Sequence, residues 1–121
     1  MFNLELPFHP TSSAIARQFV SDCSENLDRG HLLERARLVV SELVGNAIRH
    51  GRPPLAVSCE EADGGLRVTV SDGSANKPEL RDAAATDEAG RGLFLVESLA
   101  ESWGTDPGAG GGKAVWAVIS G

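Results

Sequence analysis

The chain has 121 residues, of which 41% are hydrophobic and 23% are charged, and its formal net charge is −6. This length and composition predict a single globular domain over residues 1–121 that buries roughly 65% of its unfolded surface. An acidic balance without a basic block disfavours direct binding to nucleic acid or to an anionic membrane. No apolar run is long enough for a membrane span and no secretory signal is recognisable, so a cytoplasmic protein is expected.

The N-terminal half predicts one strand followed by two amphipathic helices. Phe2, Leu4 and Leu6 alternate with polar residues, which is the pattern of a half-buried strand. Apolar residues then recur at helical spacing from Thr11 or Ser12 to Leu27, and again from Leu32 to Gly51. Two consecutive helices are therefore expected before the next strand.

The C-terminal half predicts a hairpin, a long loop, a third helix and a last strand. These segments are expected at 55–59 and 66–70 with a turn at 60–65, at 72–91 for the loop, at 93–103 for the helix, and at 113–119 for the strand after a glycine-rich turn at 104–112. The element order predicts an α+β fold, in which helices cover one face of a mixed, mainly antiparallel sheet in a two-layer sandwich.

The cysteines and histidines give no sign of a metal site. Cys23 and Cys59 have neither the density nor the spacing of a disulfide framework or a zinc site, so inert buried thiols are expected. His9, His31 and His50 are far apart in sequence, and no paired ligand motif surrounds them. A metal held by protein side chains alone is not expected.

Three short motifs could carry chemistry, and each also has an ordinary structural explanation. Glu42 and Asn46 are four residues apart, so they share one helix face that either meets solvent or lines a polar site. Asp72 is either a turn residue that ends a strand or a buried acceptor for an exocyclic amine. The segment Gly90-Arg91-Gly92 is either a hinge or a place where backbone N–H groups approach a phosphate before a helix.

Taken together, these motifs resemble the nucleotide-binding boxes of the GHKL ATPase superfamily. The order is Glu42 and Asn46 with His50-Gly51, then Asp72-Gly73-Ser74, then Gly90-Arg91-Gly92, then Gly112 to Trp116. Within that superfamily the chain looks most like the anti-sigma-factor serine kinase branch, because of the stretches ELVGNAIRHG and GRGLFLVESLAESWG. The resemblance covers nearly the whole chain and implies a Bergerat-type ATP-binding fold.

The resemblance also implies roles for individual residues. Asn46 would hold Mg²⁺ through its amide oxygen, and Glu42 would accept the proton of the attacking hydroxyl. Asp72 would accept the adenine amino group, which favours ATP over GTP. The other residues implied in nucleotide binding are Ser74, Gly90, Arg91, Gly92 and Leu93, with Gly90 and Gly92 allowing a lid from Pro78 to Arg91 to close over the phosphates.

Two positions depart from the family pattern. Ser74 stands where a glycine is common, and Ala114 stands where related chains often carry a threonine whose hydroxyl reaches adenine through water. Loss of one such hydrogen bond would cost about 1 kcal/mol, or about fivefold in affinity, which would not abolish ATP binding.

The function implied by the resemblance is that of an ATP-dependent protein serine kinase that is also an anti-sigma factor. Such a protein binds a sigma factor and phosphorylates an anti-anti-sigma antagonist of the STAS type, and it forms a homodimer. One alternative is a non-catalytic module whose lid switches partner affinity when ATP binds. A second alternative, a detached histidine-kinase catalytic domain, is disfavoured because the lid is short and no phosphoacceptor-histidine helix is recognisable.

Overall fold

The computed structural model describes residues 1–75 and 88–121, with the backbone alone over 88–93 and at 109. In chain order its elements are β1 (Phe2–Leu6), α1 (Ser12–Asn26), α2 (Leu33–His50), β2 (Leu55–Ala62), β3 (Gly65–Asp72), α3 (Glu88–Leu99), β4 (Ser102–Pro107) and β5 (Lys113–Ile119), with short 3-10 turns at Gly30–Leu32 and Ala109–Gly111. Within the described residues, no helix has both the length and the apolar character needed to cross a bilayer.

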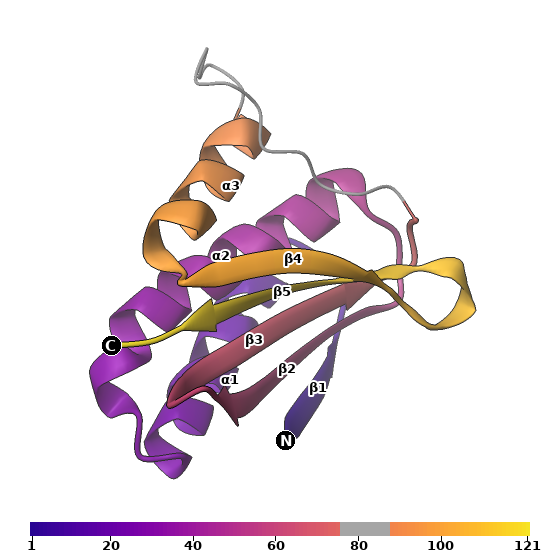
Figure 1. The fold of residues 1–121 in the computed structure, drawn as a ribbon. Coiled ribbons are helices and arrows are strands. Elements are labelled where there is room, and N and C mark those ends of the chain that lie inside the picture. The colour runs from indigo at the N-terminus through magenta and orange to yellow at the C-terminus, as the bar shows by residue number, and fades with distance from the viewer. Residues whose placement is uncertain (76–87) are drawn as a thin grey trace.

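The strands form a five-stranded sheet in the order β1-β2-β3-β5-β4, and every pairing among these described strands is antiparallel. Helices α1 and α2 lie across one side of this sheet, and α3 packs beside α2 (Figure 1). The predicted α+β two-layer sandwich is therefore confirmed. Because all three helices lie on one side, each strand has an inner face toward the core and an outer face that none of them covers.

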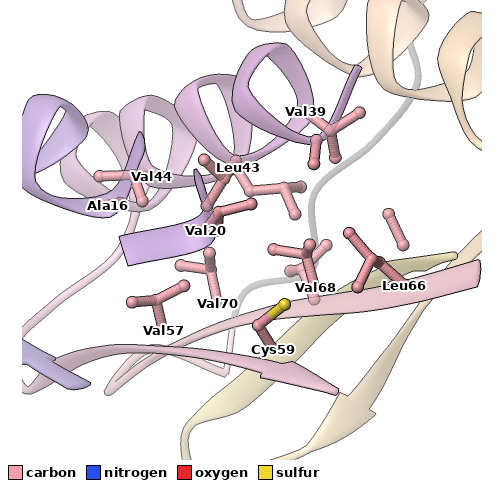
Figure 2. Packing of buried hydrophobic residues seen from close by; sticks show 14 of the residues in the cluster. Ala16, Val20, Val39, Leu43, Val44, Val57, Cys59, Leu66, Val68 and Val70 are labelled. Atoms are coloured by element: carbon pink, nitrogen blue, oxygen red, sulfur yellow. The ribbon is translucent and has the colours of Figure 1, made fainter. Parts of the chain in front are cut away.

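Alternating burial along the strands defines the core. The side chains of Val57 and Cys59 on β2 and of Val68 and Val70 on β3 are buried, whereas the residues between them are partly exposed. Figure 2 shows these strand residues facing apolar side chains of α1 and α2, including Val44. Full burial of one such side chain contributes roughly 1.5–3 kcal/mol, so this layer holds α2 firmly on the sheet.

Two part-buried hydrogen bonds from arginines join α1 and α2. Arg17 Nη1 on α1 donates to Ser41 Oγ on α2 at 2.7 Å. In the opposite direction, Arg37 Nη1 on α2 donates to Ser21 Oγ on α1 at 3.0 Å. Helix α2 is therefore held by its apolar face below and by these hydrogen bonds at its side.

The expectation of inert free thiols is wrong. Cys23 on α1 and Cys59 on β2 form a disulfide, with their Cα atoms 6.5 Å apart and a sequence separation of 36. Their burial in the core is as expected, with exposed fractions of 2% and 0%. The sequence pattern gave no sign of the pairing, because only the packing of α1 on β2 brings the two sulfurs together.

The predicted C-terminal helix was placed too late in the sequence, and one strand was missed. Helix α3 already begins at Glu88 and ends at Leu99, and the chain then turns into β4. Trp103, which the helical spacing assigned to the third helix, lies on β4 opposite Ala117 of β5. Its side chain packs against the edge of the core. The sequence of β4 lacks the alternation of apolar and polar residues that predicts a strand. This edge strand therefore depends on its pairing with β5.

The hairpin turn is shorter than the predicted span of 60–65. Strand β2 runs to Ala62 and β3 starts at Gly65, so only Asp63 and Gly64 connect them. Both residues have positive φ, 51° and 77°. A type I′ hairpin turn has positive φ at both central residues and favours the sequence Asp-Gly, and its twist matches that of the flanking strands.

The outer face of the sheet carries a small polar and aromatic cluster. The Arg67 guanidinium lies 4.6 Å from the centroid of the Trp116 ring and pairs with Asp106 at 3.7 Å. A β-carbon at Gly104 would meet this ring at 2.8 Å, so the tryptophan lies flat over the glycine of the neighbouring strand. These residues are on the opposite side of the sheet from the helices.

Candidate functional site

Asn46 carries a nearly buried side-chain amide that has no hydrogen-bond partner among the described residues. It lies on the C-terminal half of α2 and is 8% exposed. Its side chain makes no hydrogen bond within residues 1–75 and 88–121, yet no fully buried side-chain nitrogen or oxygen there lacks a partner. The amide atoms must therefore account for part of the remaining exposure. A buried polar group left open in this way is suited to bind a ligand.

Glu42 lies one turn earlier on the same face of α2. It is partly exposed, and its carboxylate forms no ion pair or hydrogen bond with any described residue. The neighbouring Ser41, by contrast, is held by Arg17. The helix therefore presents a carboxylate and an amide that no described residue pairs with, on a backbone that the α1 contacts keep in place.

Asp72 ends β3 and is buried, with 5% of the residue exposed, and each oxygen of its carboxylate accepts one hydrogen bond from a described donor. Its Oδ1 accepts a hydrogen bond from the backbone N–H of Ser74 at 2.7 Å. Its Oδ2 accepts one from Lys113 Nζ at 2.8 Å. The carboxylate is thus fixed in orientation by one donor from its own turn and one from β5.

Close backbone contacts bring the end of α2 onto Asp72. A β-carbon at Gly51 would lie 2.6 Å from the Asp72 Cγ and 2.5 Å from the Ala47 carbonyl oxygen. A β-carbon at Gly73 would clash with the Pro53 carbonyl, and Gly73 N donates to Arg52 O at 2.6 Å. Glycine at these positions lets the helix end and the strand end touch, so the helix that carries Asn46 converges on Asp72.

Sequence reasoning missed the part that Lys113 takes in this site. Lys113 is directly opposite Asp72 in the β3–β5 ladder, and both side chains point to the inner face of the sheet. Ala114 is the next residue along the strand and therefore points to the outer face. The β5 side chain that lies beside Asp72 therefore belongs to Lys113 and not to Ala114.

A signal for Lys113 was present in the sequence. Lys113, Val115, Ala117 and Ile119 follow one another at intervals of two residues, so all four lie on one face of the strand. The opposite face carries Ala114, Trp116 and Val118, which are equally apolar. The sequence pattern alone therefore does not say which face points to the core.

Gly90 and Gly92 lie within the first turns of α3, because the helix already begins at Glu88. The expectation that these glycines precede the helix is therefore wrong. The side chains of Arg91 and Leu93 are outside the described residues, as is the span 78–87 of the expected lid, so the predicted roles of these residues in nucleotide binding stay predictions. Helix α3 itself packs against α2, the helix that carries Glu42 and Asn46.

The arrangement fits a magnesium-bound nucleotide. The described residues contain no group of three or more His, Cys, Asp or Glu side chains able to hold a metal. A magnesium ion at the open Asn46 amide would thus take its other ligands from phosphate and water, which is usual for this ion. Asp72 offers a fixed acceptor at the other end of the site, and Glu42 offers a carboxylate free to accept a proton.

Comparison with known proteins agrees with this geometry. A family model described as the histidine kinase-like ATPase domain matches residues 6–119, a range that includes every site residue named above. No curated protein matches the chain. The match covers nearly the full length, from the end of β1 to the end of β5. The chain therefore belongs to the histidine kinase-like ATPase family of the GHKL superfamily and is an ATP-binding, kinase-like module.

Proposed function

We propose that the chain is an ATP-dependent protein serine kinase that also acts as an anti-sigma factor. The observation that carries the kinase proposal is that two groups on one face of α2, the Glu42 carboxylate and the Asn46 amide, have no partner in the part of the chain that the structure describes. A module that only binds nucleotide needs the amide for its metal but has no use for a free carboxylate one turn away.

The proposed mechanism assigns one step to each group. Asp72 would accept the adenine amino group, and Asn46 would hold Mg²⁺, which neutralises charge on the phosphates when bound. Glu42 would accept the hydroxyl proton of the substrate serine. The serine oxygen then bonds to the γ-phosphorus while the bond from that phosphorus to the bridging oxygen breaks, so that phosphoserine and ADP are the products. Most of the rate enhancement would come from positioning and charge neutralisation.

The proposed protein substrate is an anti-anti-sigma antagonist of the STAS type, and the proposed regulatory partner is a sigma factor. Both rest on the resemblance of the motif sequences to the anti-sigma-factor branch. The kinase test is transfer of labelled phosphate from Mg·ATP to purified STAS-type proteins, followed by mapping of the modified residue. Labelling of a serine is expected, and labelling of a histidine would overturn the serine kinase proposal.

The anti-sigma proposal has its own test. The purified chain is mixed with sigma factors and the complex is isolated by gel filtration, with and without an unphosphorylated antagonist. A complex that the antagonist disrupts supports the proposal, whereas no binding to any sigma factor of the same genome argues against it. The resemblance also implies a homodimer, for which sedimentation of the free chain is the direct measurement.

The two departures from the family pattern, Ala114 and Ser74, favour the alternative of a non-catalytic module. Ala114, however, points to the outer face of the sheet, away from Asp72. Ser74 donates its backbone N–H to Asp72, a contact that glycine would make equally well. Tight ATP binding with no transfer to any STAS-type protein would favour this alternative over the kinase.

A further inference from the structure

Lys113 and Asp72 form a buried ion pair at the end of the site where the nucleobase is proposed to bind. The Lys113 Nζ and Asp72 Oδ2 atoms are 2.8 Å apart, and the side chains of Lys113 and Asp72 are 7% and 1% exposed. Burial of two charges costs several kcal/mol, and a hydrophobic pair of the same volume is often as stable. The ion pair is thus expected to add little to the stability of the fold. A role in binding would explain its presence.

A count of donors and acceptors shows that both groups have unused capacity. An ammonium group has three N–H donors, and Lys113 makes one hydrogen bond, to Asp72, among the described residues. A carboxylate has about four acceptor positions, of which Asp72 uses one for Lys113 and one for the Ser74 N–H. Each partner can therefore make a further bond, Lys113 as a donor and Asp72 as an acceptor.

An acceptor and a donor held side by side match one edge of adenine. On that edge the exocyclic amino group donates, and the adjacent ring nitrogen N1 accepts. We propose that Lys113 is a base-contacting specificity residue, which donates to N1 of adenine while Asp72 accepts from the amino group. This inference rests on the proposed nucleotide site and adds to it a second direct contact with the base.

The same pair disfavours a base with the reverse pattern. Hypoxanthine, placed in the same orientation, would direct its carbonyl oxygen at the Asp72 carboxylate and its N1–H at the Lys113 ammonium. Both contacts would be repulsive, so rejection would come from two groups instead of one. The geometry that supports this arrangement is the register that places Lys113 opposite Asp72 on the inner face.

The direct test compares ADP with 1-deaza-ADP, in which a C–H replaces N1, by calorimetric titration of the unmodified chain. Loss of one hydrogen bond to a charged donor predicts that 1-deaza-ADP binds about ten- to hundredfold more weakly. This comparison needs no variant, so it holds even where substitution of a buried charge disturbs folding. If ADP binds and 1-deaza-ADP binds equally well, the role of Lys113 is excluded and the proposed function stands. If no nucleotide binds, the proposed function itself fails.

A variant series assigns the effect to Lys113. Lys113→Met keeps the length of the side chain and removes the donor, so ADP and 1-deaza-ADP should bind with equal affinity. Arg67→Met is the matched control, because it removes a cation from the opposite face of the adjacent strand; it should keep the full discrimination. Circular dichroism spectra confirm that each variant is folded. Discrimination that survives in folded Lys113→Met would mean that another group contacts N1 and would overturn the proposal.

Discussion

Gly51 and Asp72 are in direct contact, and a β-carbon at position 51 would lie 2.6 Å from the Asp72 carboxyl carbon. The φ angle of Gly51 is −99°, so the glycine is needed for space and not for backbone conformation. Without that space, the end of α2 could not close onto the end of β3. The proposed nucleotide site thus depends on the absence of a single methyl group.

Gly51→Ala is expected to lower the free energy of unfolding by about 1–3 kcal/mol, the usual cost of overpacking. It should also weaken ADP binding, since Asp72 must move to make room. Urea denaturation and calorimetry measure the two effects. Gly30→Ala is the control, because nothing lies within 4 Å of a β-carbon there, and its change should stay within about 0.5 kcal/mol. Equal behaviour of the two variants would contradict the close contact.

Glu42→Gln is expected to reduce phosphate transfer to the serine substrate by about a hundredfold or more, with little change in ATP affinity. The reason is that the amide keeps the size of the side chain but cannot accept the hydroxyl proton. Single-turnover transfer assays separate this step from binding. Glu34→Gln alters an exposed glutamate in the first turn of the same helix and should leave transfer unchanged. Full activity in Glu42→Gln would remove this residue as the base.

Asn46→Ala should separate ligand binding from stability. Because the amide makes no hydrogen bond within the described residues, its removal breaks no hydrogen bond there. Alanine also has the higher helix propensity, so stability should be unchanged or raised by up to about 0.7 kcal/mol. The increase in ATP affinity on adding Mg²⁺ should disappear, which titrations with and without the metal would detect. A preserved Mg²⁺ effect would place the ion elsewhere.

Reduction of the Cys23–Cys59 disulfide is expected to lower the free energy of unfolding by about 4 kcal/mol. The bond closes a loop with a sequence separation of 36, and a cross-link of that span restricts the unfolded chain strongly. Denaturation midpoints with and without reductant give the effect, and a thiol assay under denaturing conditions confirms the bond. The double variant Cys23→Ala with Cys59→Ala should be insensitive to reductant. Identical midpoints for the oxidised and reduced chain would show that the cross-link contributes nothing.

The helices α1 and α2 and most of the sheet were predictable because each carries its own periodic signal. Strand β4 was not, because Trp103 falls at helical spacing from Leu99 and the strand exists only through its ladder with β5. The spacing of Glu42 and Asn46 placed both on one face, since local helix geometry is enough for that. The Lys113–Asp72 pair and the disulfide each join residues more than 30 positions apart, so they depend on register and packing that no local pattern specifies.

Helix α2 packs Val40 and Val44 into the core on one side and carries Asn46 on another, so anything bound at Asn46 acts on a helix that the whole fold requires. Ligand occupancy and thermal stability are then linked quantitatively. A ligand present at one hundred times its dissociation constant raises the free energy of unfolding by about 2.7 kcal/mol. A melting-temperature screen of nucleotides, metals and base analogues on unlabelled protein therefore measures ligand preference directly, before any phosphorylation substrate has been identified.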